Sequence, residues 1–227
     1  MTPKEGATPL MLLATCYLLL RTTNMALFQK FQREDNLFQL VRENPIAAND
    51  EDGFIKLIIG LGNVGKEFEE TRHNSGFLAV DCYAKENSFP KWQEKTKFKA
   101  HLTEDFINGK KVVLAKPTTL YNLSGEAVRA LKDFYKLGNK DIIVVHDELD
   151  LPFGTVKEKI GGGSAGSNGL KSIISHIGAD FKRIRIGIKN ELLEKMDPAD
   201  FVLAKFSSKE KKQLDQIIET AIKNFPG

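Results

Sequence analysis

From about residue 54 onward, short apolar runs rich in β-branched residues alternate with segments of helical periodicity. Runs of the first kind predict buried strands, whereas apolar positions three and four residues apart predict helices. The predicted strands are 54–60, 98–102, 111–115, 141–146, 156–160 and 181–188. The predicted helices are 75–87, 124–135, 170–177 and 207–224. Because strands alternate with helices, the pattern predicts an α/β layered domain.

A hairpin is predicted between the second and third of these strands. Asn108 and Gly109 lie between the two strand-like runs, and Asn-Gly is a preferred dipeptide in two-residue hairpin turns. A hairpin joins antiparallel strands, so the sheet is expected to contain some antiparallel pairing.

The first 53 residues differ in pattern from the rest of the chain. Residues 9–20 form an apolar run, but it is shorter than the roughly 20 residues that a membrane-spanning helix needs. Residues 25–42 have the pattern of a short helix, and a polar linker follows them. We therefore expect residues 1–53 to be an N-terminal extension or leader with a linker, and residues 54–227 to be one folded domain. An alternative is that translation starts at Met25, which would exclude the apolar run.

Composition and charge are those of an ordinary globular protein. Hydrophobic residues make up 41% of the chain, and 33 Lys and Arg residues against 30 Asp and Glu residues leave a formal charge of +3. These values exclude collagen-like and wholly disordered chains, but not a nucleic-acid partner. Two cysteines, Cys16 and Cys82, are too few for a disulfide framework or a cysteine-rich zinc site, so a reducing compartment is expected. The four scattered histidines form no metal-binding pattern, and no metal is expected.

Residues 60–65 match the pattern G-x-G-x-x-G and follow a predicted strand. This pattern marks a dinucleotide site when its third glycine begins a helix. Here Asn74, Ser75 and Gly76 follow closely, and together they are a poor helix interior. We therefore favour a glycine-rich strand-to-loop turn, with a dinucleotide enzyme as a disfavoured alternative.

Four loops are unusually polar for segments that adjoin apolar strands: 62–74, 116–125, 146–152 and 161–169. Two of them directly follow buried strands, and α/β folds place ligand sites at the carboxyl ends of strands. A histidine there can take a proton from water near neutral pH, and a carboxylate on its other ring nitrogen fixes its tautomer. Asparagine amides can position water and a carbonyl group. Water attack assisted by a general base is the simplest hydrolytic interpretation of this combination of side chains.

Each of these side chains also has a purely structural interpretation. His73 could end a turn, and Asp147 could form one at a strand end, with Asp150 an equally good aspartate by composition. Three asparagines could form Asx turns or cap a helix: Asn63, Asn122 and Asn168.

Four motifs follow one another between about residue 54 and residue 206: GLGNVGKEFEETRHNSG, KPTTLYNLSG, HDELDLPFG and GGGSAGSNGLKSI. In this order and at these spacings they resemble the bacterial-type peptidyl-tRNA hydrolase family. The resemblance implies a single α/β domain with a mixed, mostly parallel central sheet flanked by helices. It implies hydrolysis of the ester between peptide and tRNA, in translation and ribosome rescue. It also implies a cytoplasmic monomer that needs no cofactor or metal and has no stable membrane association.

The resemblance also assigns roles to individual residues. His73 would be the base that activates water, and Asp147 would orient and polarise it. Four residues would bind the substrate near the scissile ester: Asn63, Tyr121, Asn122 and Asn168. Lys159 and Arg185 would bind tRNA phosphates, and both lie in a stretch, 157–189, in which basic residues outnumber acidic ones.

Three positions depart from the pattern of the family. Val64 stands where the family usually has proline, Tyr121 where it usually has methionine, and Ser167 where it usually has histidine. Tyr121 is bulkier and its hydroxyl could change the peptide pocket, whereas Ser167 keeps only a shorter hydrogen-bond donor. A non-catalytic RNA-binding relative therefore remains an alternative, although the retained His73 and Asp147 favour an enzyme.

Overall fold

The computed structural model describes residues 54–226. The predicted N-terminal helix, the linker and the apolar run lie outside the described residues, so the predictions for residues 1–53 stay predictions.

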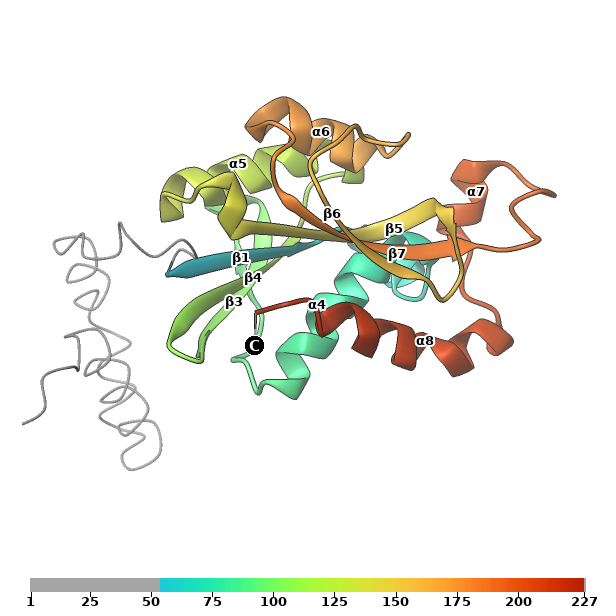
Figure 1. Cartoon of the computed structure of the whole chain (residues 1–227), viewed down its shortest axis with the longest axis horizontal. Coiled ribbons are helices and arrows are strands. Elements are labelled where there is room, and N and C mark those ends of the chain that lie inside the picture. Colours follow the sequence, from blue (N-terminus) through green and yellow to red (C-terminus); the bar gives the residue numbers. More distant parts are fainter. Residues whose placement is uncertain (1–53, 227) are drawn as a thin grey trace, which may run out of the picture. The chain divides into compact units, whose positions relative to one another are not determined.

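One mixed sheet of seven strands runs through this part of the chain, in the order β2-β3-β4-β1-β5-β7-β6 (Figure 1). Its centre is parallel and consists of β4 (Lys110–Pro117), β1 (Ile55–Gly60), β5 (Ile142–Pro152) and β7 (Lys182–Lys189). Antiparallel strands complete both sides: β2 (Gln93–Lys95), β3 (Ala100–Ile107) and β6 (Val156–Ile160). The predicted mixed, mostly parallel sheet and the Asn108-Gly109 hairpin are confirmed.

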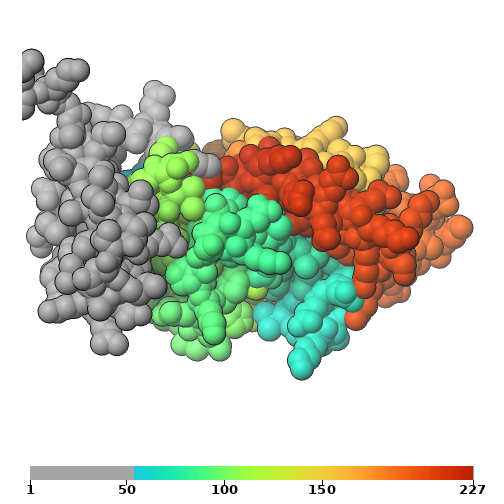
Figure 2. Space-filling view, turned by 90° about the horizontal axis from the view of Figure 1, so that it is seen from below, coloured from blue at the N-terminus to red at the C-terminus, as the bar shows by residue number. Residues whose placement is uncertain are grey.

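Helices cover both faces of the sheet (Figure 1). On one face lie α4 (Ser75–Glu86) and α8 (Ser208–Ile222), which also lie next to each other on the surface in Figure 2. On the other face lie α5 (Ser124–Tyr135) and α6 (Asn168–Ile177), which contact each other. The short helix α7 (Pro198–Leu203) precedes α8. The 3₁₀ helices are η2 (Lys66–Phe68), η3 (Arg72–Asn74), η4 (Thr96–Phe98), η5 (Tyr121–Leu123) and η6 (Asn139–Asp141).

The core lies between the sheet and the helices on each side. Leu57, Ile58 and Ile59 of β1 are all fully buried, because a central parallel strand is covered on both faces. Ile58 packs with Val145 and Ile184 in the apolar cluster beneath α4 and α8. This burial explains why the strand sequences are continuous apolar runs.

Two glycines allow α4 to pack directly on the sheet. A Cβ atom on Gly60 would lie 2.3 Å from the carbonyl oxygen of Gly76, and one on Gly76 would lie 2.3 Å from that of Val145. Gly65 is followed by the short η2 rather than by the α-helix that a dinucleotide site requires. The prediction of a glycine-rich turn at residues 60–65 is therefore confirmed.

Three elements differ in extent from their predictions. Strand β3 runs over Ala100–Ile107 and not over 98–102, because the chain forms η4 up to Phe98. Strand β5 continues to Pro152, whereas the apolar pattern ends near His146. Its polar residues can enter the sheet because β5 keeps pairing with β7 and because the buried Asp147 and Glu148 have polar partners. Helix α6 begins at Asn168, with Ser167 as its cap. Neither α7 nor β2 is predicted from the sequence, because both are short and largely polar or exposed.

Candidate active site

The central feature of the site is a contact between His73 and Asp147. His73 lies in η3 immediately before α4, and Asp147 lies on β5. The Nδ1 atom of His73 is 3.1 Å from Oδ1 and 3.0 Å from Oδ2 of Asp147. Because the carboxylate accepts the Nδ1 proton, the imidazole has its lone pair on Nε2, where it can accept a proton from water.

The carboxylate of Asp147 is buried but well supplied with hydrogen bonds. Burial acts to raise the pKa of Asp147, yet the charge and hydrogen bond of His73 hold that pKa below its ordinary value. The phenol of Tyr121 also donates to Oδ1, at 3.1 Å. Asp147 is therefore a carboxylate at neutral pH, as a partner that stabilises an imidazolium must be.

Tyr121 contacts both members of this pair. Its ring stacks on that of His73, with 3.6 Å between the centroids and 23° between the planes. The ring also lies against the first turn of α6, since a Cβ atom on Gly169 would be 2.5 Å from its Cε1 atom. Burial and the nearby Asp147 raise the pKa of Tyr121 well above its usual value, so the side chain is a neutral phenol.

The turn that carries His73 is fixed by its neighbour Arg72. The Arg72 guanidinium is almost fully buried and donates to the carbonyl oxygens of Ala204 and Lys205, each at 3.1 Å. Its Nη2 atom is 2.8 Å from Oε2 of Glu210, at the start of α8. The same guanidinium lies over the ring of Phe201. The segment around α7 and α8 therefore holds η3 in place.

Asn63 is joined to the same turn through Asn74. The backbone nitrogen of Asn63 donates to Oδ1 of Asn74 at 2.8 Å, and Nδ2 of Asn74 donates to the carbonyl oxygen of Asn63 at 2.9 Å. This reciprocal pair fixes the loop after β1 relative to His73. The side chain of Asn63 is partly exposed and can face a substrate.

Asn122 and Asn168 are exposed, and each is next in sequence to a residue of the Tyr121–Gly169 contact. Asn122 follows Tyr121 in η5, and Asn168 lies directly before Gly169, which contacts the Tyr121 ring. Asn168 does not cap α6, because the cap is the Ser167 hydroxyl, which accepts a hydrogen bond from the backbone nitrogen of Leu170 at 3.3 Å. Both asparagines are therefore direct sequence neighbours of residues that contact each other at the site.

Basic side chains line one face of the β6–β7 pair. Lys159 lies opposite Arg183, and Lys157 lies opposite Arg185, so the four side chains share one face of the sheet. Lys159 is exposed, whereas the Nε atom of Arg185 is 2.9 Å from a carboxylate oxygen of the buried Glu148. Arg183 is buried and donates to the carbonyl oxygens of Gly162 and Gly163, at 2.6 Å each.

This part of the chain offers no obvious metal site, because no group of three or more His, Cys, Asp or Glu side chains in residues 54–226 is placed to hold an ion. Nor does any helix within these residues have the length and apolar character to cross a membrane.

Sequence reasoning identified the two central side chains but not those that support them. Arg72, Glu210 and Asn74 were not singled out, and each acts through contacts with distant or backbone groups. One available signal was position, since Arg72 and Asn74 directly flank His73.

Comparison with known proteins identifies the family. The sequence model of the family described as Peptidyl-tRNA hydrolase matches residues 57–226. The chain therefore belongs to the peptidyl-tRNA hydrolase family, as its four motifs predict.

Relatives and solved structures agree with this assignment. A peptidyl-tRNA hydrolase from Aliarcobacter butzleri is 49% identical over 166 residues, which cover 73% of this chain and 87% of that protein. One from Fusobacterium nucleatum is 48% identical over 166 residues, covering 73% of this chain and 84% of the relative. The crystal structure of a peptidyl-tRNA hydrolase from Acinetobacter baumannii matches with a TM-score of 0.69 at 37% identity, over 75% of this chain and 86% of that one.

Proposed function

We propose that this protein hydrolyses the ester bond between peptide and tRNA in peptidyl-tRNA and so releases free tRNA. Membership of the peptidyl-tRNA hydrolase family supports the substrate class. The observation that carries the proposal is the distance of 3.0 Å between Nδ1 of His73 and a carboxylate oxygen of Asp147. This geometry provides a general base whose tautomer and orientation are fixed.

In the proposed reaction, Nε2 of His73 takes a proton from a water molecule as the water oxygen attacks the ester carbonyl carbon. The tetrahedral intermediate then breaks the bond to the ribose oxygen, and the imidazolium returns the proton to that oxygen. The products are a peptide carboxylic acid and the free ribose hydroxyl of tRNA. Asp147 stabilises the imidazolium between the two steps. Such acid–base assistance typically contributes ~10²–10⁴-fold to the rate.

Three asparagines would bind the peptide and the attacking water: Asn63, Asn122 and Asn168. Peptide side chains vary from one substrate to another, so recognition has to use backbone amide groups, and side-chain amides both donate to and accept from these. The exposure of Asn122 and Asn168 next to Tyr121 supports this role. An amide that donates to the developing oxyanion would also lower the barrier.

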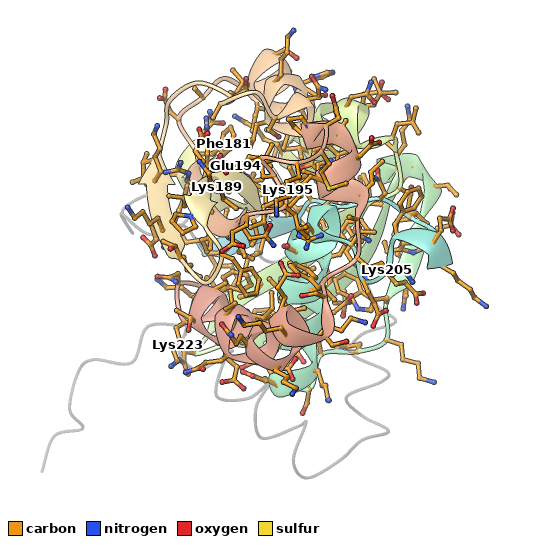
Figure 3. The ribbon with its side chains drawn as sticks, turned by 90° about the vertical axis from the view of Figure 1, so that its right-hand side faces the viewer. Phe181, Lys189, Glu194, Lys195, Lys205 and Lys223 are labelled. Atoms are coloured by element: carbon orange, nitrogen blue, oxygen red, sulfur yellow. The ribbon has the colours of Figure 1, made fainter. Side chains whose placement is uncertain are left out.

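The tRNA would be bound through its phosphates by Lys159 and Arg185. Their shared face of the β6–β7 pair supports this, because clustered basic groups attract a polyanion. Further exposed lysines, at positions 189, 195 and 205, lie on the side of the molecule that faces the viewer in Figure 3. The backbone of Lys205 pairs with that of Thr71, near His73.

The family resemblance further supports a cytoplasmic monomer that acts without a metal or organic cofactor. The alternative of a non-catalytic RNA-binding relative is not favoured, because the His73–Asp147 pair is assembled and hydrogen-bonded.

The proposal is tested by measuring release of tRNA from an N-acetylated aminoacyl-tRNA by the purified full-length chain. We expect turnover by the intact protein and a loss of at least about 10²-fold in His73→Ala. The variant should stay folded but be less stable, by roughly 1–3 kcal/mol, because the buried Asp147 loses its partner; circular dichroism at the assay temperature confirms that it is folded. An intact protein that released tRNA no faster than buffer, or a fully active His73→Ala variant, would reject the proposed chemistry.

A further inference from the structure

The phenol of Tyr121 is turned toward the catalytic pair rather than toward solvent. The residue is 7% exposed. Its hydroxyl donates to Oδ1 of Asp147 at 3.1 Å, and its ring stacks on His73. A residue whose role was to line the peptide pocket would present its polar end to the substrate, and this one presents it to a buried carboxylate.

We propose that Tyr121 is a positioning residue of the hydrolytic reaction, which holds the Asp147 carboxylate and the His73 imidazole in their productive orientation. The inference rests on the proposed function of His73 as the base. The resemblance to the family predicts that Tyr121 contacts the peptide, and that prediction is untested. The role proposed for Tyr121 is an effect on turnover.

The hydroxyl acts on the carboxylate. Nδ1 of His73 lies almost equally far from both oxygens of Asp147, at 3.1 and 3.0 Å, so this contact alone does not decide which oxygen accepts the Nδ1 proton. The phenol binds only Oδ1 and removes that freedom. Hydrogen bonds to a buried anion are among the stronger ones in proteins, so the restraint is substantial.

The ring acts on the imidazole. With 23° between the planes and 3.6 Å between the centroids, the phenol ring covers one face of His73 and limits its rotation. The phenol ring is itself held from behind, because Gly169 in α6 leaves no room between its backbone and the Cε1 and Cδ1 atoms of Tyr121. A side chain without a flat ring could not provide this support.

Two of the three positions that depart from the family pattern meet at this point. Ser167 lies two residues before Gly169, whose backbone lies against the Tyr121 ring, and the Ser167 hydroxyl caps α6. The first turn of α6, with the exposed Asn168, is thereby connected through Tyr121 to the catalytic pair. Tyr121 and Ser167 therefore belong to one arrangement and are not two unrelated departures from the family pattern.

The test compares Tyr121→Phe, which keeps the ring and removes the hydroxyl, with Tyr121→Met, which removes both. We expect Tyr121→Phe to lower kcat by about tenfold with KM within about twofold, because the lost interaction is with the catalytic pair and not with substrate. Tyr121→Met should lower kcat further. The matched control is Tyr135→Phe, which removes a phenol that donates to the carboxylate of Glu104 at 2.8 Å, outside the site. Its kcat should be that of the intact protein.

A second measurement does not depend on turnover. The proton between Nδ1 of His73 and Asp147 is expected to give a downfield NMR signal, which would be assigned by its loss in His73→Ala. We expect this signal to move in Tyr121→Phe and to stay in place in Tyr135→Phe. An unmoved signal would overturn the proposal, as would an unchanged kcat or a raised KM at constant kcat in Tyr121→Phe. If kcat is unchanged in Tyr121→Phe while His73→Ala is inactive, only the positioning role fails; an active His73→Ala defeats the hydrolytic mechanism itself.

Discussion

His73 and Asp147 are 74 positions apart in the sequence, yet Nδ1 of the first lies 3.0 Å from a carboxylate oxygen of the second. The contact forms because η3 precedes a helix that packs on β1 and β5, and because β5 carries the aspartate two residues beyond Val145, where its pairing with β1 ends. A charge that favours the imidazolium is thereby placed at Nδ1, on the side of the ring away from Nε2.

The first prediction concerns that charge. We expect Asp147→Asn to lower kcat by roughly 10²-fold or more while KM changes little, because the amide can neither stabilise the imidazolium nor enforce the same tautomer. Steady-state kinetics on a blocked aminoacyl-tRNA provide the measurement. Asp150→Asn is the control, since Asp150 is exposed and should be dispensable. An equal loss in both variants would speak against the assignment.

The second prediction concerns the basic face of β6 and β7. Lys159→Ala and Arg185→Ala should each weaken tRNA binding and lower the slope of log K against log salt by about one, because one phosphate contact is lost. Binding to a catalytically inactive His73→Ala background, measured at several salt concentrations, tests this. Lys85→Ala, an exposed lysine of α4, should leave the slope as it is. A slope that stayed constant in both site variants would remove them from the tRNA contact.

These two variants should differ in stability. Arg185→Ala leaves the buried Glu148 without its ion pair and should lower the free energy of unfolding by roughly 1–3 kcal/mol. Lys159→Ala should not, because Lys159 is exposed. Urea denaturation of both proteins distinguishes a lost phosphate contact from a weakened fold.

The third prediction concerns the ion pair of Arg72 and Glu210. Burial acts to raise the pKa of Glu210, but hydrogen bonds from Ser207 and Arg72 hold it below its ordinary value. A carboxyl group with a lowered pKa in the folded state stabilises the fold above its unfolded pKa, and this stabilisation is lost as pH falls through the folded value. Glu210→Gln should therefore cost about 3 kcal/mol at neutral pH, and the difference should shrink in acid.

Denaturation of the intact protein and of Glu210→Gln at a series of pH values measures this effect. Glu219→Gln provides a matched control in the same helix, because Glu219 is exposed. A constant difference between Glu210→Gln and the intact protein across the acid range would contradict the linkage.

The fourth prediction concerns His146, whose Nδ1 donates to the carbonyl oxygen of Asp147 at 2.6 Å. Among the hydrogen bonds of residues 54–226, none involves its buried Nε2 atom, and burial lowers the pKa of His146. Below about pH 6.5 the unfolded chain binds a proton at this histidine and the folded chain does not. The free energy of unfolding therefore decreases as the pH is lowered through this range. His146→Gln should flatten the pH dependence of unfolding in that range, and an unchanged pH dependence would contradict the assignment.

The sequence contains enough information to predict the sheet and to single out His73 and Asp147, which the structure brings into contact. Apolar runs such as 54–60 predict buried strands because a strand that is covered on both faces is apolar at every position. Polar residues directly after such runs indicate a site at the carboxyl edge of the sheet. The aspartate itself was harder to place. Asp147 and Asp150 are equivalent by composition, and only the structure shows that one is buried beside His73 while the other is exposed.

Other features depend on contacts that no local pattern contains. Arg72 and Glu210 are 138 positions apart, and neither a surface nor a core pattern predicts a buried arginine. The sequence also does not predict the orientation of Tyr121. A tyrosine has an apolar ring and a polar hydroxyl, so it can either line a pocket or form a buried hydrogen bond.

The position of the His73 imidazole depends on Gly60 and Gly76, whose close packing is possible only because neither has a side chain. A methyl group at Gly76 would collide with Val145 of the strand that also bears the aspartate. Relief of that collision would lift the start of α4, and with it the imidazole, away from its acidic partner. A mutation at either glycine would thus inactivate the enzyme although His73 and Asp147 are both still present in the sequence.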